Sequence, residues 1–194
     1  MEDQIAISRL KQGDLDGLET LVIRYQVQAV HAAYLILYDR SLAEDVVQTA
    51  FVKAAQRIHQ FEDGRPFGPW FSRIVVNDAL KLAKKQERSV SLDEDQDDAT
   101  IQIAKWLTDP DPNPEQLVEQ KETRQVILKA IQSLPPGQRA VIVMKYFYDM
   151  RMSDMSMKTG RPLSTIKWWL RDARKRLRGL MEPSKAPRGD RSQS

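Results

Sequence analysis

Cysteine is missing from this sequence of 194 residues, and histidine and glycine are scarce, with two and eight residues. Without cysteine the chain has no disulfide, no thiolate metal ligand and no cysteine nucleophile, and this fits a reducing compartment. His31 and His59 have no partner at ligand spacing, and no glycine-rich phosphate loop occurs. We therefore expect no metal, no cofactor and no enzyme activity.

Long apolar runs are also missing. No run approaches the roughly 18–20 residues that span a bilayer. The acidic start, Met1-Glu2-Asp3-Gln4, lacks the apolar region of a signal peptide. We therefore expect neither membrane insertion nor export. The long helical periodicities and the low glycine content predict an all-α fold.

Charge is distributed unevenly along the chain. The net charge of +3 divides into 0 for residues 1–88, −8 for 89–122 and +11 for 123–194. The acidic and proline-punctuated segment 89–114 predicts a flexible linker between two small helical domains, 1–88 and 115–182. We expect the tail 183–194 to be disordered and basic. The basic end indicates a polyanionic partner.

Four helices are predicted in the first domain, at 3–12, 14–38, 42–59 and about 70–86. Asp14 is the expected cap of the second helix, and Ser41 with Glu44 forms a capping-box pattern before the third. An aromatic-rich loop, 60–69, precedes the fourth helix, which becomes increasingly basic. The residues alone favour core positions for these aromatic rings, although aromatic side chains beside cations can also stack on unpaired bases.

The second domain is expected to end in a helix-turn-helix. Helices are predicted at 114–133, 138–148 and 153–158, followed by a turn at Gly160 and a last helix that Ser164 caps. Ile166, Leu170 and Ala173 form one apolar stripe of that helix, and cations occupy the opposite face. This pattern predicts a reader of the DNA major groove. An ordinary amphipathic helix with a solvated basic face is the alternative.

Four segments carry a resemblance to a known family. They are AEDVVQTAF at 43–51, FGPWFSRIVVN at 67–77, Leu134-Pro135, and STIK at 164–167. In their order and spacing they resemble bacterial sigma factors of the extracytoplasmic-function (ECF) group, over nearly the whole chain. The resemblance implies a transcription initiation factor that gives RNA polymerase its promoter specificity and helps to open the duplex.

The resemblance also implies three sets of site residues. The set that meets core polymerase is Asp45, Gln48, Thr49 and Phe51. The set that holds the single strand of the −10 element is Phe61, Phe67, Trp70, Arg73, Asn77, Lys81, Lys84 and Lys85. The set that reads the −35 duplex is Ser164, Thr165, Lys167, Trp168, Arg171, Arg174 and Lys175.

The partners implied are core RNA polymerase, through its largest-subunit coiled coil and its flap, promoter DNA, and an anti-sigma factor. The family resemblance further implies a bacterial cytoplasmic protein, monomeric when free, that an anti-sigma factor can sequester at the inner membrane face. Two other classes fit parts of the sequence. A DNA-binding regulator that does not enter the polymerase would not need the surface at Asp45 or the aromatic loop. The basic C-terminal segment argues against a scaffold for a signalling helix.

The chain departs from the family pattern at several positions, which include Asp154-Met155-Ser156-Met157 at the start of the helix-turn-helix and the pair Trp168-Trp169. Thr49 stands where an acidic residue is frequent, and Lys81 stands where many members have Asp. Trp168 replaces a small or polar residue of the last helix. Its ring can contact a thymine methyl group or pack on Leu163 as a hydrophobic staple, and the sequence slightly favours the staple.

Overall fold

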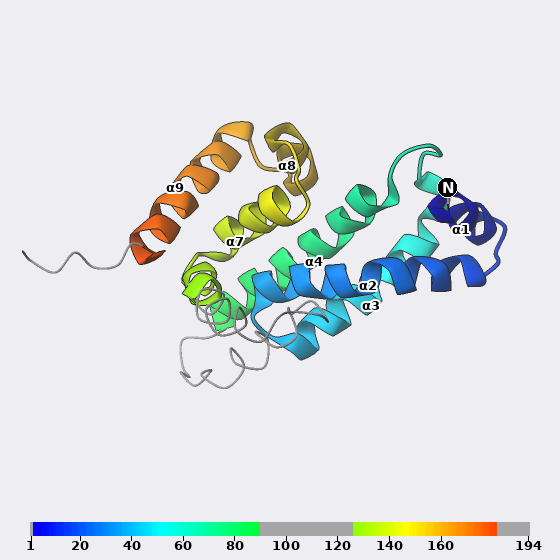
Figure 1. Ribbon diagram of the computed structural model, residues 1–194, viewed down its shortest axis with the longest axis horizontal. Helices are drawn as coiled ribbons and strands as arrows, with labels where there is room; N and C mark the ends of the chain where they lie inside the picture. Colours follow the sequence, from blue (N-terminus) through cyan, green and yellow to red (C-terminus); the bar gives the residue numbers. More distant parts are fainter. Residues whose placement is uncertain (1, 90–125, 182–194) are drawn as a thin grey trace, which may run out of the picture.

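The computed structural model describes residues 2–89 and 126–181, and within these ranges the chain forms helices and turns without a strand (Figure 1). This confirms the predicted all-α fold. The predicted tail, and all but the first residue of the predicted linker, lie outside the described residues.

The first domain consists of four α-helices and a short 3-10 helix. Their bounds are α1 Glu2–Lys11, α2 Asp16–Leu37, α3 Arg40–Gln56, η1 Ile58–Gln60 and α4 Phe67–Ser89. Helices α2, α3 and α4 pack against one another around a core of aliphatic and aromatic side chains, and α1 packs on α2 (Figure 1). The fourth helix begins three residues earlier than the sequence predicts, so Phe67 belongs to the helix and not to the loop.

The cap of α3 differs from the prediction. The Asp39 carboxylate accepts a hydrogen bond from the Leu42 amide at 2.9 Å, and the helix begins at Arg40. The predicted capping box at Ser41 is therefore wrong, because Ser41 already lies inside the helix. Glu44 pairs with the Arg40 side chain at 2.8 Å instead of reaching back to the cap.

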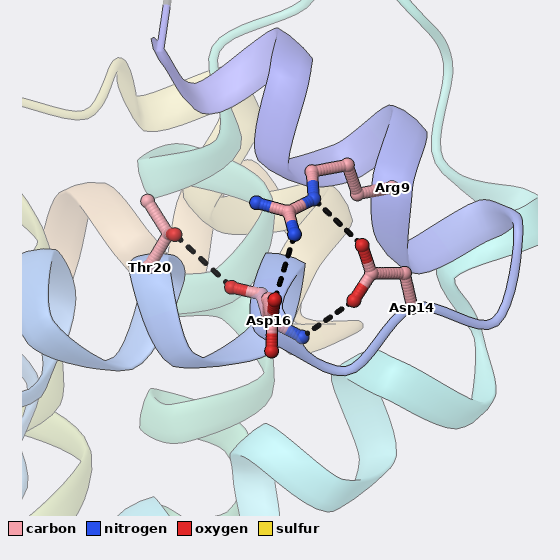
Figure 2. A network of polar contacts seen from close by, with 4 residues as sticks. All are labelled: Arg9, Asp14, Asp16 and Thr20. Carbon is pink, nitrogen blue, oxygen red and sulfur yellow. Dashed lines mark hydrogen bonds and ion pairs between the residues drawn. The ribbon is translucent and has the colours of Figure 1, made fainter.

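A polar network fixes α1 to the start of α2 (Figure 2). Arg9 donates from Nε to Asp14 and from Nη2 to Asp16, each at 2.7 Å. Asp14 also accepts the Asp16 amide at 3.0 Å, but the N-cap residue of α2 is Leu15, so the predicted cap is one residue off. The hydrogen bond from Arg9 lowers the pKa of Asp14.

The second domain begins, in the described residues, with a helical segment at 126–132. It continues with α7 Pro136–Ile142, the π-helical turn η2 Val143–Phe147, α8 Met152–Thr159 and α9 Leu163–Met181. Gly160 caps α8 at φ 64°, a left-handed conformation that suits glycine. The helix, turn and helix arrangement is therefore confirmed. Helix α9 begins one residue before Ser164, which places Ser164 in the first turn and not at the cap.

Helix α9 is held against α7 by its apolar stripe and by two specific contacts. Ile166, Leu170 and Ala173 are buried, as the periodicity predicts. A Cβ atom at Gly137 would lie 2.9 Å from the Trp169 ring, so the glycine permits this close approach. Buried Gln138 donates to Asp172 at 2.7 Å. These contacts turn the cations of α9 away from the core.

Candidate polymerase and nucleic-acid interfaces

The outward face of α3 is polar with one apolar residue. Asp45, Gln48 and Thr49 are exposed, as their predicted contact with a partner requires. Phe51 is only 6% exposed, and its ring stacks on Phe71 with centroids 4.3 Å apart. Phe51 is therefore a core residue, which corrects its assignment to the interface. Val52 is 56% exposed beside this face, although the sequence analysis did not single it out.

A shallow hollow of about 450 Å³ runs from this face of α3 to the C-terminal half of α4. It is lined by Leu42, Asp45, Val46, Thr49, Lys53, Asp78, Lys81, Leu82 and Lys85. Thr49 and Lys81, two of the residues that depart from the family pattern, therefore line the same hollow. The two helices bring Asp45 and Lys85 to the same surface, which a linear sequence does not reveal.

The aromatic residues around the 61–66 loop form core and not a stacking platform. Phe61 and Phe67 are 3% and 0% exposed, and their ring centroids lie 5.9 Å apart. Phe67 also contacts Tyr25 and stacks on Phe71. The prediction that Phe61 and Phe67 stack on bases is thus wrong for this structure, because α1, α2 and α4 cover the rings. Trp70 remains partly exposed.

A polar cleft of about 310 Å³ separates the end of α3 from the first half of α4. Its lining combines four predicted −10 residues, Trp70, Arg73, Asn77 and Lys81, with Lys53, Arg57, Gln60, Ile74 and Asp78. Lys53 and Arg57 were missed, although their spacing of four residues on the outer face of a predicted helix is a usable signal. Lys53 pairs with Asp78 at 2.7 Å, which fixes α3 to α4 across the cleft.

The two remaining cations of the predicted −10 set lie farther along α4. Lys85 lines the hollow beside α3 rather than the cleft, and Lys84 is half-buried. The structure therefore divides the predicted −10 set into a cleft group, a buried aromatic pair and a C-terminal lysine pair.

A larger groove of about 840 Å³ runs along α9. Its lining is Lys145, Arg151, Met152, Lys167, Leu170, Arg171, Arg174, Lys175, Arg178 and Gly179, without a carboxylate. Four of the predicted −35 residues, Lys167, Arg171, Arg174 and Lys175, are brought together here. Lys145 and Arg151 were missed because they come from η2 and from the residue before α8, and no local pattern relates them to α9.

Tyr146 positions one cation of this groove. Arg174 donates from Nε to the Tyr146 hydroxyl at 2.9 Å, and its guanidinium carbon lies 5.8 Å from the ring centroid. A side chain held in this way loses less conformational entropy when it binds an anion.

The other predicted −35 residues lie outside the groove lining. Ser164 is exposed, Thr165 is half-buried and Trp168 is 50% exposed. Leu163 and Trp168 are five residues apart in one helix, so they project about 140° apart. The favoured staple between them is therefore wrong. Trp168 projects away from the buried stripe, on the side of the helix that a helix-turn-helix presents to DNA.

A helix-turn-helix beside a carboxylate-free groove is typical of a DNA-binding protein, and the first domain carries a second hollow whose lining includes several cations. Comparison with known proteins makes this specific. The family "Sigma-70 region 2" matches residues 21–89 and "Sigma-70, region 4" matches residues 124–177, together well over half of the chain.

Similar proteins of known function cover almost the whole chain. The ECF RNA polymerase sigma-E factor of Escherichia coli K12 is 28% identical over 94% of this chain and 96% of its own length. The RNA polymerase sigma-H factor of Pseudomonas aeruginosa is 25% identical over 94% and 95%. The chain belongs to the ECF group of the sigma-70 family. It is an RNA polymerase sigma factor, which directs promoter-specific transcription initiation.

Two solved structures share the fold. CnrH, solved with the cytosolic domain of CnrY, has a TM-score of 0.59 at 21% identity and covers 93% of this chain and 97% of that chain. The sigma factor RpoE of Bartonella quintana, solved with the anti-sigma factor NepR, has a TM-score of 0.60 at 20% identity and covers 86% and 98%.

Two further features of the described residues bear on the chemistry. No cluster of three or more His, Asp or Glu side chains among them is placed to hold a metal ion. No helix in the same ranges is both long and apolar enough to cross a membrane.

Proposed function

We propose that this sigma factor uses three separate surfaces: the outward face of α3 for core polymerase, the cleft between α3 and α4 for the −10 single strand, and the groove beside α9 for the −35 duplex. The observation that carries this division is the presence of two cation-lined hollows on different domains. The matched regions 2 and 4 support it, because the cleft lies within region 2 and all of the groove lining except Arg178 and Gly179 lies within region 4.

The polymerase surface consists of Asp45, Gln48 and Thr49, with Val52 beside them. One carboxylate, two uncharged polar groups and an exposed valine give an apolar contact with polar neighbours, which is the usual composition of a protein interface. Its proposed target is the coiled coil of the largest polymerase subunit, and the second domain is assigned to the flap.

The −10 surface combines a ring with donors. Partly exposed Trp70 offers a face for one unpaired base, and such stacking stabilises binding by about 1–3 kcal/mol. Arg57, Arg73 and Lys81 line the same cleft and attract the phosphates of that strand. Lys84 and Lys85 extend the path of positive charge along α4. Trapping an unpaired base keeps melted DNA open without the hydrolysis of ATP.

The −35 surface separates base contacts from phosphate contacts. Lys167 and Arg171, with Ser164, Thr165 and Trp168, occupy the N-terminal half of α9, which enters the major groove in this motif. Arg171 is suited to bind guanine through two hydrogen bonds. Arg174 and Lys175 bind phosphates, so they set affinity and salt dependence rather than sequence preference.

The functional division proposed for the chain is 1–88 for polymerase and −10 contacts, 89–114 as the linker, 115–182 for the −35 contact and 183–194 as the tail. An anti-sigma factor is the proposed regulator, since two proteins of this fold were solved with such partners or a partner domain. We assign the protein to the bacterial cytoplasm as a monomer without cofactor or catalytic activity, with sequestration at the inner membrane face by that regulator.

Paired variants test whether the surfaces are separate. Asp45→Ala with Gln48→Ala should weaken binding to core polymerase about tenfold or more, since interface side chains of this kind contribute about 1 kcal/mol each. Affinity of the free protein for −35 duplex should not change. Arg171→Ala should do the reverse, with about 1–3 kcal/mol less discrimination between promoter and random duplex.

Fluorescence anisotropy with labelled duplex and with labelled core polymerase measures both affinities. Gln26→Ala, exposed on α2 and outside the three surfaces, is the matched control. Equal loss of both affinities in both variants would mean that the surfaces are wrongly assigned, while the membership of the sigma family would still stand.

A further inference from the structure

The two domains touch at the C-terminal end of α2. The Tyr38 hydroxyl of the first domain donates to the Leu128 carbonyl of the second domain at 2.8 Å. The Arg139 guanidinium carbon lies 5.4 Å from the centre of the Tyr38 ring. Tyr38 and Leu128 are buried, so water is excluded from this contact. Burial also lowers the pKa of Arg139.

The domains meet again where α8 lies on the first half of α4 (Figure 1). The Asn77 carboxamide donates from Nδ2 to the Lys158 carbonyl at 2.9 Å. In return, the Lys158 ammonium donates to the Pro69 carbonyl at 2.6 Å. Burial lowers the pKa of Lys158, while the charge of Asp154 raises it and the charge of Arg73 lowers it. The Lys158 ammonium is thus partly desolvated near the cation Arg73, and it donates this hydrogen bond to the Pro69 carbonyl.

We propose that α8 docks on the surface formed by Pro69, Arg73 and Asn77, and that single-stranded −10 DNA competes with α8 for it. The proposal that α8 blocks DNA binding rests on the function proposed above for the α3–α4 cleft. Asn77 lines that cleft, and the Nδ2 group that would donate to a base or a phosphate is occupied by the Lys158 carbonyl. The Lys158 ammonium similarly occupies the carbonyl of Pro69, the residue directly before Trp70.

The occupant is a segment of the same chain, and it can leave. The chain between Ser89 and Val126 can span on the order of 100 Å when extended, so covalent connection does not force the domains together. The hydrogen bonds at α8 join groups that can each form equivalent bonds with DNA or water. A ligand that binds only the open arrangement, such as single-stranded DNA or core polymerase, therefore shifts the population toward it.

The −35 groove is not part of the interdomain contact, because residues of the second domain alone line it. Lys167, Arg171 and Arg174 belong to this lining. We therefore expect the interface to lower affinity for single-stranded DNA and to leave duplex affinity unchanged. The two affinities together distinguish this interface from a general loss of DNA binding.

Distance measurements on the full chain test the interface. Because the sequence has no cysteine, Gln28→Cys and Ser153→Cys label only one exposed position in each domain. Tyr38→Phe with Lys158→Ala removes two interdomain hydrogen bonds and retains the buried ring. The variant should open the domains, seen as a longer and broader distance distribution between spin labels. Its affinity for a random single-stranded 20-mer should rise about threefold or more, since apparent affinity scales with the open fraction.

Lys129→Ala, an exposed lysine of the second domain, is the control for lost charge, and thermal unfolding checks that each variant folds. A broad, long distance distribution in the unmodified chain would overturn the proposed interface. A short distance that lengthens in the variant without any gain in single-strand affinity would overturn the masking of DNA. Neither outcome bears on polymerase or duplex binding, which the paired variants of the preceding subsection measure.

Discussion

Tyrosine hydroxyls in this protein lose much of their contact with water on folding. Burial raises the pKa of Tyr34 to about 12, and burial together with the hydrogen bond to Asp3 raises the pKa of Tyr25 to about 12. Burial also raises the pKa values of Tyr38 and Tyr148. The unfolded chain releases these protons near pH 10, so the folded chain holds them more tightly. The stabilisation is complete below pH 10 and is lost as the pH rises from 10 to 12.

The free energy of unfolding should therefore fall between pH 10 and 12. Tyr34→Phe should reduce this fall, because phenylalanine has no proton to lose. Two pKa units at one buried group correspond to roughly 2–3 kcal/mol. Urea unfolding at pH 9 and pH 11.5, followed by circular dichroism, measures the difference. A fall of equal size in the unmodified protein and in Tyr34→Phe would contradict this account.

The predicted site residues that the structure leaves exposed are those whose exposure follows from the periodicity of one helix. Asp45, Gln48 and Arg171 are on the outer faces that helical periodicity predicts. The family resemblance assigned Phe61 and Phe67 to DNA, whereas the residues alone favoured core positions, and the structure buries both rings. Burial of a loop aromatic depends on residues far away in the chain, and periodicity carries no information about such contacts.

Helices α1 and α2 approach each other closely at Gly17. A Cβ atom at Gly17 would lie 2.2 Å from the Ala6 carbonyl oxygen and 2.8 Å from the Leu10 amide nitrogen. Both neighbours are backbone atoms, so no side-chain rotation can relieve the overlap. The close crossing of the two helices therefore requires glycine at this position.

Gly17→Ala should destabilise the first domain by about 1–3 kcal/mol, the usual cost of overpacking. Urea unfolding measures this change in the free energy of unfolding. Gly179→Ala is the matched control, because a Cβ there meets nothing within 4 Å, and helix propensity makes the substitution neutral or stabilising by up to about 1 kcal/mol. Gly17→Ala with unchanged or greater stability would show that α1 does not pack on α2 as described.

At the level of elements, the sequence predicted the order of the described α-helices and their ends only within a few residues. It did not predict the 3-10 helix η1, which overlaps the end of a segment predicted as continuous helix, or the π-helical turn η2, which lies inside another. The buried stripe of α9 and the turn at Gly160 were predicted because both are local. The start of α4 at Phe67 and the cap at Asp39 were not, since several residues near each end can serve as a cap and tertiary packing selects one of them.

At the level of the whole molecule, the sequence predicted two domains but not their contact. The hydrogen bonds of Tyr38 with Leu128 and of Asn77 with Lys158 join residues that are 90 and 81 positions apart. Their amino-acid types occur commonly on helix surfaces, so no pattern marks them in advance. This contact places α8 next to the proposed −10 surface, so the two domains must separate before that surface can bind DNA.

The central claim is that this chain recruits core RNA polymerase to promoters. Transcription reconstituted from core polymerase and genomic promoter fragments, with and without the purified chain, tests it most directly. We expect specific transcripts only when the chain is present, and fewer of them with Asp45→Ala plus Gln48→Ala. Specific transcripts that do not depend on adding the chain, or none in its presence on any fragment, would contradict the claim.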